Sequence, residues 1–137
     1  MTNFTSLFSS QKQNWRTPER FYKELDREFH FDFDPCPANP TFNGLQIPWK
    51  DRNFVNPPYC DVAKWIKKGV GETKLGKLVV FLVAARTDAF WFHEYVLPYA
   101  KEVRFIKGRL RFSGHKGPAP FPSMIIVFNG VNFQEKL

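Results

Sequence analysis

The chain has 137 residues, enough for one hydrophobic core and too few for a separate recognition domain. Its net charge of +7 favours a polyanionic partner, and an aromatic content of 18% provides both core residues and stacking surfaces. The 2 cysteines lie outside any Cys-x-x-Cys pattern, so we predict neither a disulfide framework nor a metal site. The longest apolar stretch, residues 78–85, is too short to span a membrane, and without an export signal the expected location is the cytoplasm.

The N-terminal segment, residues 1–14, is polar without a clean period, which predicts a flexible arm before a single domain over residues 15–137. Thr17 then precedes Pro18, an order typical of a helix N-cap followed by proline in the first turn. Apolar side chains recur beyond Pro18 at the spacing of one helix face. We therefore expect a short amphipathic helix over residues 18–29.

A brief strand is predicted next, ending at Asp34 and Pro35. A carboxylate at the carboxyl edge of such a strand can accept hydrogen bonds from a ligand. Residues 39–52 are loop-like and too few to hold two further strand–helix units before the next strand. The sheet is therefore expected to be reduced.

The most distinctive stretch is an apolar pair followed by Asn56-Pro57-Pro58-Tyr59. Proline has a fixed φ and biases the residue before it towards an extended conformation, so this stretch predicts a rigid rim after a strand. The Asn56 amide oxygen and the proline carbonyls can accept hydrogen bonds from an amino group, and Tyr59 offers a flat face for stacking. Acceptors on both protons of an exocyclic amine localise its lone pair on nitrogen, which makes the nitrogen a better nucleophile. The rim therefore predicts transfer of an alkyl group to nitrogen.

The second half of the chain alternates helices and strands. Asp61 is expected to cap a helix, and the continuously apolar residues 78–84 predict a central parallel strand buried on both faces. The remaining expected elements are a largely buried helix, a strand and a last buried strand, at residues 89–97, 103–106 and 124–128.

Basic residues gather after the central strand and in the glycine- and proline-rich stretch before the last strand. Arg109 and Arg111 alternate with Leu110 and Phe112, so the two arginines should project to one face. We expect the basic residues to contact a nucleic acid, mostly at phosphate: Arg86, Lys107, Arg109, Arg111 and Lys116.

Asn56-Pro57-Pro58-Tyr59 matches the Asp/Asn/Ser-Pro-Pro-aromatic signature of amino-group methyltransferases that use S-adenosylmethionine. Several other segments resemble, in the same order, the phage-encoded N6-adenine DNA methyltransferase (Dam) family. They are residues 15–18, 31–36, 85–93, 109–114 and 120–124. The resemblance covers nearly the whole chain.

The resemblance implies an α/β class protein with a reduced Rossmann-like methyltransferase fold of about five strands, the last antiparallel. It implies transfer of a methyl group from S-adenosylmethionine to adenine N6 in DNA. The implied catalytic residues are Asn56, Pro57, Pro58 and Tyr59. The implied cofactor-binding residues are Thr17, Pro18, Asp34, Pro35 and Asn56.

Larger methyltransferases follow the Asp-Pro pair with a glycine-rich turn, whereas residues 36–40 of this chain read Cys-Pro-Ala-Asn-Pro. We therefore expect weak cofactor binding by the isolated protein. Two other functions stay open: a degenerate, non-catalytic DNA-binding protein of the same fold, and a protein glutamine N-methyltransferase. The charge of +7 favours DNA. A phage-encoded protein would act in the cytoplasm of its bacterial host.

Overall fold

The computed structural model describes residues 16–114 and 116–131. The predicted arm over residues 1–14 lies outside this part of the chain. The helices are α2 (Glu19–Phe29), α3 (Val62–Thr73) and α4 (Leu97–Tyr99), with a 3-10 turn η1 (Tyr59–Asp61) and a π-helical turn η2 (Phe92–Val96). The strands are β1 (Arg52–Val55), β2 (Leu78–Ala84), β3 (Glu102–Phe105) and β4 (Ser123–Asn129).

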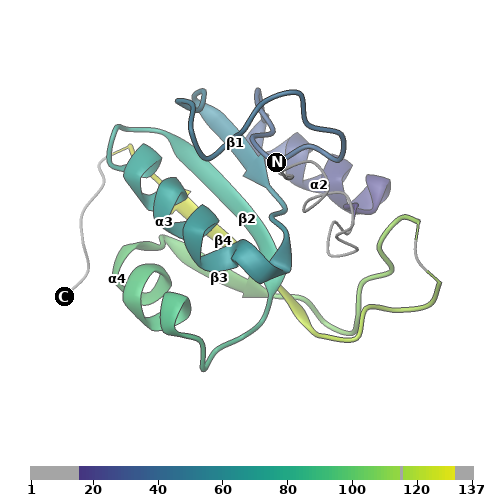
Figure 1. Ribbon diagram of the computed structural model, residues 1–137. Helices are drawn as coiled ribbons and strands as arrows, with labels where there is room; N and C mark the ends of the chain where they lie inside the picture. The colour runs from purple at the N-terminus through teal and green to yellow at the C-terminus, as the bar shows by residue number, and fades with distance from the viewer. Residues whose placement is uncertain (1–15, 115, 132–137) are drawn as a thin grey trace, which may run out of the picture.

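One mixed sheet in the order β1-β2-β4-β3 forms the centre of the molecule (Figure 1). β1 and β2 are parallel, while β4 runs antiparallel to both of its neighbours, as predicted for the last strand. The described residues form four strands rather than about five. The segment before β1 forms only one bridge, in which Phe33 pairs parallel to Asn53. The fold is therefore a smaller α/β sheet than expected.

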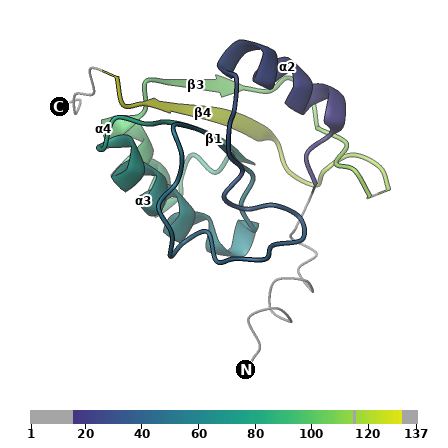
Figure 2. The ribbon, with the colours of Figure 1, turned by 90° about the horizontal axis from the view of Figure 1, so that it is seen from above.

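Helices cover both faces of the sheet, so the molecule has three layers. Figure 2 shows α2 on one side, and α3 and α4 on the other. All residues of β2 are buried, and they alternate between the two cores. Val79 and Phe81 belong to the core beneath α3, whereas Val80 and Leu82 belong to the core beneath α2. The apolar run of β2 thus reflects burial on both faces.

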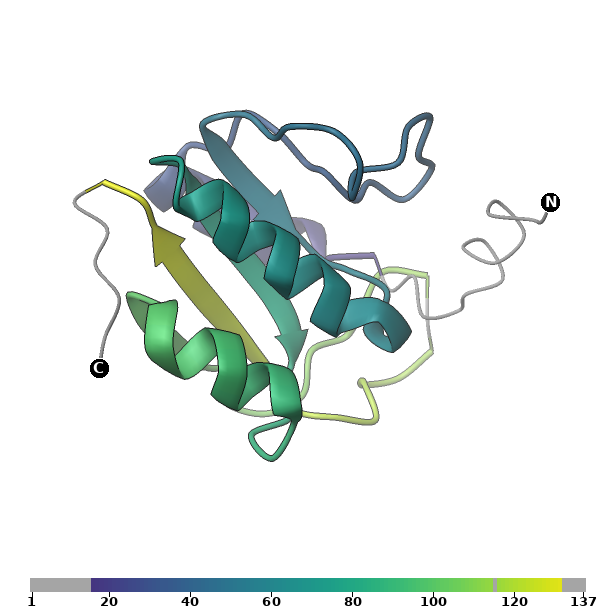
Figure 3. The same cartoon turned by 60° about the vertical axis from the view of Figure 1, so that its left-hand side comes forward.

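Two predicted helices differ in detail from those observed. α2 begins at Glu19 with Pro18 at its N-cap, and no side chain caps it, so the prediction of Thr17 as the N-cap is wrong. The helix expected at residues 89–97 contains the π-helical turn η2 and ends at Tyr99. Figure 3 shows this helix beside α3 on the same face of the sheet. No helix in the described ranges combines the length and apolar character needed to cross a membrane.

A buried carboxylate fixes the chain that leads into β1. Glu72 on α3 accepts the Trp49 backbone N–H at 3.1 Å, and it pairs with Lys68 at 2.9 Å and with Lys77. Burial opposes ionisation, but the hydrogen bonds from Lys77, Lys68 and Trp49 outweigh it and hold the pKa of Glu72 below its ordinary value. The chain entering the amino end of β1 is therefore tied to the carboxyl end of α3.

Two glycines of α3 provide a test of how this helix packs on β2. A β-carbon at Gly69 would lie 2.5 Å from Phe81 Cε2, a ring that is fully buried, whereas one at Gly71 would meet no atom within 4 Å. We expect Gly71→Ala to raise the free energy of unfolding by about 1 kcal/mol through helix propensity. Gly69→Ala should lower it by about 1–3 kcal/mol through overpacking. Urea denaturation measures both, and equal changes would contradict this packing.

Candidate active site

The sheet topology brings together side chains from three segments of the sequence. Asn56 follows β1 directly, and Arg86 follows β2, so both lie at the carboxyl edge of the parallel pair. The Phe33–Asn53 bridge is also parallel, which places Asp34 at the same edge. Open α/β sheets bind ligands at this edge.

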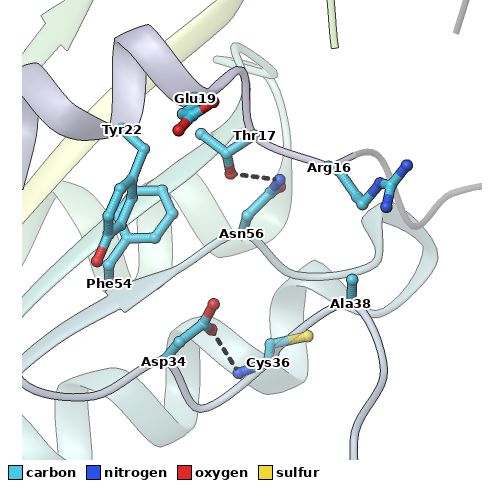
Figure 4. A pocket seen from close by; sticks show the side chains of 9 residues that line it. All are labelled: Arg16, Thr17, Glu19, Tyr22, Asp34, Cys36, Ala38, Phe54 and Asn56. Carbon is cyan, nitrogen blue, oxygen red and sulfur yellow. Dashed lines mark hydrogen bonds between the residues drawn. The ribbon is translucent and has the colours of Figure 1, made fainter. Parts of the chain in front are cut away.

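A pocket of about 310 Å³ opens beside β1 (Figure 4). Its walls come from the start of α2, the loop after Phe33 and the end of β1. Thr17, Asp34 and Asn56, three of the residues predicted to bind a cofactor, line it. Pro18 and Pro35 are not among its lining residues; Pro35 is buried.

A hydrogen bond between distant segments orients the key amide. Asn56 Nδ2 donates to Thr17 Oγ1 at 3.0 Å (Figure 4). The Thr17 hydroxyl serves this contact instead of capping α2. Because the amide nitrogen turns towards Thr17, the amide oxygen lies on the other side of the group.

The Asp34 side chain is exposed, and its carboxyl faces the pocket in Figure 4. Neighbouring protein atoms nonetheless remove part of the hydration of the carboxyl. This desolvation raises the pKa of Asp34 from 3.8 to about 6, although the Cys36 backbone N–H donates to Oδ1 at 2.9 Å and opposes the rise. Asp34 is therefore an anionic hydrogen-bond acceptor at neutral pH.

Two aromatic rings line the pocket, although the sequence predicted no binding role for them. Tyr22 and Phe54 pack edge to face with ring centroids 5.1 Å apart. Burial, followed by the charges of Asp26 and Asp34, raises the pKa of Tyr22, so its hydroxyl stays protonated. In the sequence these rings are indistinguishable from core positions of a helix and a strand, because nothing local indicates that a pocket opens beside them.

The loop after Asp34 differs from the glycine-rich turn of larger methyltransferases, and its packing is tight. A β-carbon at Gly44 would lie 2.0 Å from the Pro35 carbonyl oxygen and 2.9 Å from the ring of Trp65. Trp49 Nε1 donates to the Gly44 carbonyl at 2.7 Å. The glycine that the chain requires here therefore lies at the far end of the loop, away from the pocket lining.

The proline rim is rigid, and its two carbonyls differ. Pro57 and Pro58 are buried, and the Asp61 N–H donates to the Pro58 carbonyl at 2.9 Å as η1 begins. No hydrogen bond from the described residues reaches the Pro57 carbonyl. Among hydrogen bonds within the described residues, the Pro58 carbonyl thus has one lone pair in use and the Pro57 carbonyl none.

A second, smaller hollow of about 20 Å³ lies on the other side of Asn56. Pro57, Tyr59, Phe112 and Phe121 contribute to its lining. The Tyr59 side chain is half exposed, and its ring centroid lies 6.1 Å from that of Phe121. Asn56 lines both cavities and therefore forms their common wall.

The predicted DNA-binding residues separate into two groups. Arg86 lies next to the hollow, with its guanidinium 5.8 Å from the centroid of the Phe121 ring. The other four, Lys107, Arg109, Arg111 and Lys116, are exposed on the segment between β3 and β4. Figure 1 shows this segment extending away from the sheet.

The alternation predicted around Arg111 is present without a β-strand. Arg109 and Arg111 are exposed, while Phe112 is buried in the core beneath α2. Arg109 Nη1 also donates to the Ala119 carbonyl at 3.4 Å, which closes the base of the loop. Leu110 is partly buried against the same core.

No cluster of His, Cys, Asp and Glu side chains suited to a metal ion occurs in the described ranges. Burial raises the pKa of the Cys36 thiol, with further contributions from Asp34 and Asp61, so this thiol is not activated. The chemistry available at this edge is therefore that of hydrogen-bond acceptors, an anionic side chain and aromatic faces.

A mixed sheet covered by helices, with Asn56-Pro57-Pro58-Tyr59 at the carboxyl edge of its parallel strands, is consistent with a methyltransferase-like α/β fold. Residues 5–129 match the family described as DNA N-6-adenine-methyltransferase (Dam). The chain belongs to this family, which confirms the resemblance found in the sequence. The family name denotes methylation of adenine N6 in DNA.

A further similarity is local. The chain is 34% identical over 50 residues to the olfactory receptor-like protein HbA1 of Apis mellifera ligustica. The match covers 36% of this chain and 30% of that protein. So short a match carries no argument about function.

The raised pKa of Asp34 predicts a pH dependence of stability. Between pH 3.8 and about 6 the folded state binds more protons at this carboxyl than the unfolded chain does, so wild-type stability should fall as the pH rises through this window. Above about pH 6 the loss is complete. We expect Asp34→Asn to be more stable than wild type at pH 7 and to lose this advantage near pH 4, as measured by urea denaturation. A constant difference from pH 4 to 8 would contradict the assigned pKa.

Proposed function

We propose that this protein transfers a methyl group from S-adenosylmethionine to N6 of adenine in DNA. Membership of the Dam family supports adenine methylation. The observation that carries the proposal is the position of Asn56 on the common wall of the 310 Å³ pocket and the aromatic hollow. A cofactor in the pocket and the edge of a base in the hollow would both contact Asn56.

The large pocket fits the chemistry of the cofactor. Its volume lies at the lower end of the range for small-molecule sites, about 300–1,000 Å³. The Asp34 carboxylate and the Thr17 hydroxyl can accept hydrogen bonds from amino and hydroxyl groups, and Tyr22 and Phe54 offer apolar faces. When bound, S-adenosylmethionine supplies an electrophilic methyl group. The chain lacks the glycine-rich turn of larger methyltransferases, so we expect weak binding by the isolated protein.

The rim of residues 56–59 supplies hydrogen-bond acceptors for the adenine amino group. The Asn56 amide oxygen and the Pro57 carbonyl would each accept one N6 proton, so that the lone pair is localised on nitrogen. The contact with Thr17 sets the direction of the amide before substrate arrives, and preorganised acceptors need no rearrangement during reaction. Tyr59, half exposed beside the hollow, would stack on the base. A paired adenine would have to be flipped out of the duplex to reach this rim.

We also propose that the protein is of the phage-encoded type and acts in the cytoplasm of a bacterial host. The ordered motifs and the reduced sheet support the phage type. The exposed basic residues between β3 and β4 support DNA as the partner, with contacts mainly to phosphate.

Calorimetric titration with S-adenosylmethionine, and with its demethylated product, tests the enzymatic proposal directly. We expect saturable binding with a Kd above about 1 μM, equivalent to less than about 8 kcal/mol of binding free energy. Asp34→Ala should abolish binding while DNA affinity stays unchanged. Absence of binding by the wild type, both alone and with DNA, would favour the non-catalytic DNA-binding alternative.

Asn56→Ala should lower the rate of methyl transfer to DNA by about 10²-fold or more, because the variant lacks an acceptor that acts in the transition state. Asn56→Asp keeps an acceptor oxygen and should retain much more activity. Asn39→Ala, an exposed amide outside the pocket lining, is the matched control. Rates come from incorporation of a labelled methyl group, and circular dichroism checks folding. A folded Asn56→Ala protein with nearly full activity would refute the assigned role.

A further inference from the structure

Arg86 lies beside Phe121, one of the residues that line the aromatic hollow. Its guanidinium lies 5.8 Å from the centroid of the Phe121 ring, and the Tyr59 ring centroid lies 6.1 Å from that of Phe121. Phe121 is buried, whereas Arg86 is exposed and Tyr59 is half exposed. An exposed cation and a half-exposed ring are therefore both close to one buried ring.

The backbone that carries Arg86 is held on both sides. The Arg86 N–H donates to the Ala84 carbonyl at 2.8 Å, and the Ala89 N–H donates to the Arg86 carbonyl at 3.1 Å. His93 Nε2 contacts the Thr87 carbonyl at 2.7 Å. With the turn pinned in this way, movement at this position is confined to the side chain.

The hollow cannot accept a base as it stands. A space of about 20 Å³ holds little more than one water molecule. Phe112 and Leu82 in its lining belong to the packed core beneath α2 and cannot withdraw without opening that core. Tyr59, which lines the hollow, and Arg86, which lies against Phe121, are exposed and have room to move aside for a base.

Resting on the proposed adenine methylation, we propose that Arg86 is a positioning residue that holds the target nucleotide out of the duplex. In the free protein its guanidinium covers the Phe121 ring. When an adenosine is extruded, the guanidinium leaves the ring and pairs with a phosphate next to that nucleotide. A charge-assisted, two-pronged contact with phosphate is stronger than an exposed cation–π contact, so the exchange is favourable.

This role separates Arg86 from the basic residues between β3 and β4. Those residues lie on the segment extending from the sheet and serve overall attraction to the phosphate backbone. Arg86 stands beside the hollow itself and acts only when a nucleotide leaves the stack. Its contribution should therefore matter most where extrusion costs most, in fully paired DNA.

The test compares methyl transfer to native plasmid DNA with transfer to the same DNA after heat denaturation, using labelled S-adenosylmethionine. Arg86→Ala should lower the ratio of duplex rate to single-strand rate by about tenfold, because unpairing is costly only in the duplex. Arg86→Lys keeps the charge without the planar fork and should restore the ratio only in part. Arg109→Ala is the matched control, and it should lower both rates together.

Equal losses on duplex and single-stranded DNA for Arg86→Ala would overturn this inference and assign Arg86 to general DNA binding. An unchanged duplex rate would overturn it as well. In both cases the wild type would still methylate DNA, so the proposed function would stand. Absence of transfer by the wild type to either form would overturn the proposed function and this inference together.

Discussion

The hydrogen bond from Asn56 Nδ2 to Thr17 Oγ1 joins segments that are 39 residues apart, and the geometry of the site depends on it. The backbone beyond Asn56 is fixed by Pro57 and Pro58, but the Asn56 side chain could still rotate about its own bonds. Thr17 removes that freedom at the wall shared by the two cavities. A single contact thus links the entrance of α2, the end of β1 and the orientation of the acceptor.

A small sheet can support such a site because loops replace missing elements and are themselves well packed. Because Gly44 has no side chain, its backbone can pack closely against the Pro35 carbonyl and the Trp65 ring. The carboxylate of Glu72 then receives the Trp49 N–H just before β1. These contacts hold the two ends of the loop without an additional strand and helix, so the carboxyl edge keeps its shape.

Charge is divided between the two sides of Asn56. The pocket beside β1 is lined by two carboxylates, Asp34 and Glu19, and by one guanidinium, Arg16; Asp34 is ionised at neutral pH despite its pKa of about 6 and can accept hydrogen bonds from a ligand. The opposite side carries Arg86 beside an aromatic hollow, with further arginines on the segment between β3 and β4. The two sides are connected, because the Ser113 N–H donates to the Arg16 carbonyl at 3.0 Å. An anionic polymer and a cationic small molecule can therefore approach the same amide from different directions.

Features that depend on neighbouring residues in the chain could be predicted from the sequence. The burial of β2 on both faces was predicted from its continuous apolar run, and the structure has it. The antiparallel last strand was implied by the family resemblance, and β4 has this orientation. The stiffness of the rim follows from its two prolines alone. The ordered motifs also identified the family, which the match over residues 5–129 confirms.

Features that depend on contacts between distant segments were decided only by the tertiary structure. Thr17 reads as a helix cap, yet its hydroxyl accepts from Asn56, because folding places β1 beside it. The sequence predicted a strand ending at Asp34, but this segment forms one bridge, from Phe33 to Asn53, and the Arg52 N–H donates to the Asp32 side chain at 2.9 Å. The sequence places Phe121 in the loop before the last strand, whereas in the structure its side chain lines the hollow. Periodicity and turn chemistry are local properties, whereas a cavity exists only where several segments meet, so its lining cannot be read from any one of them.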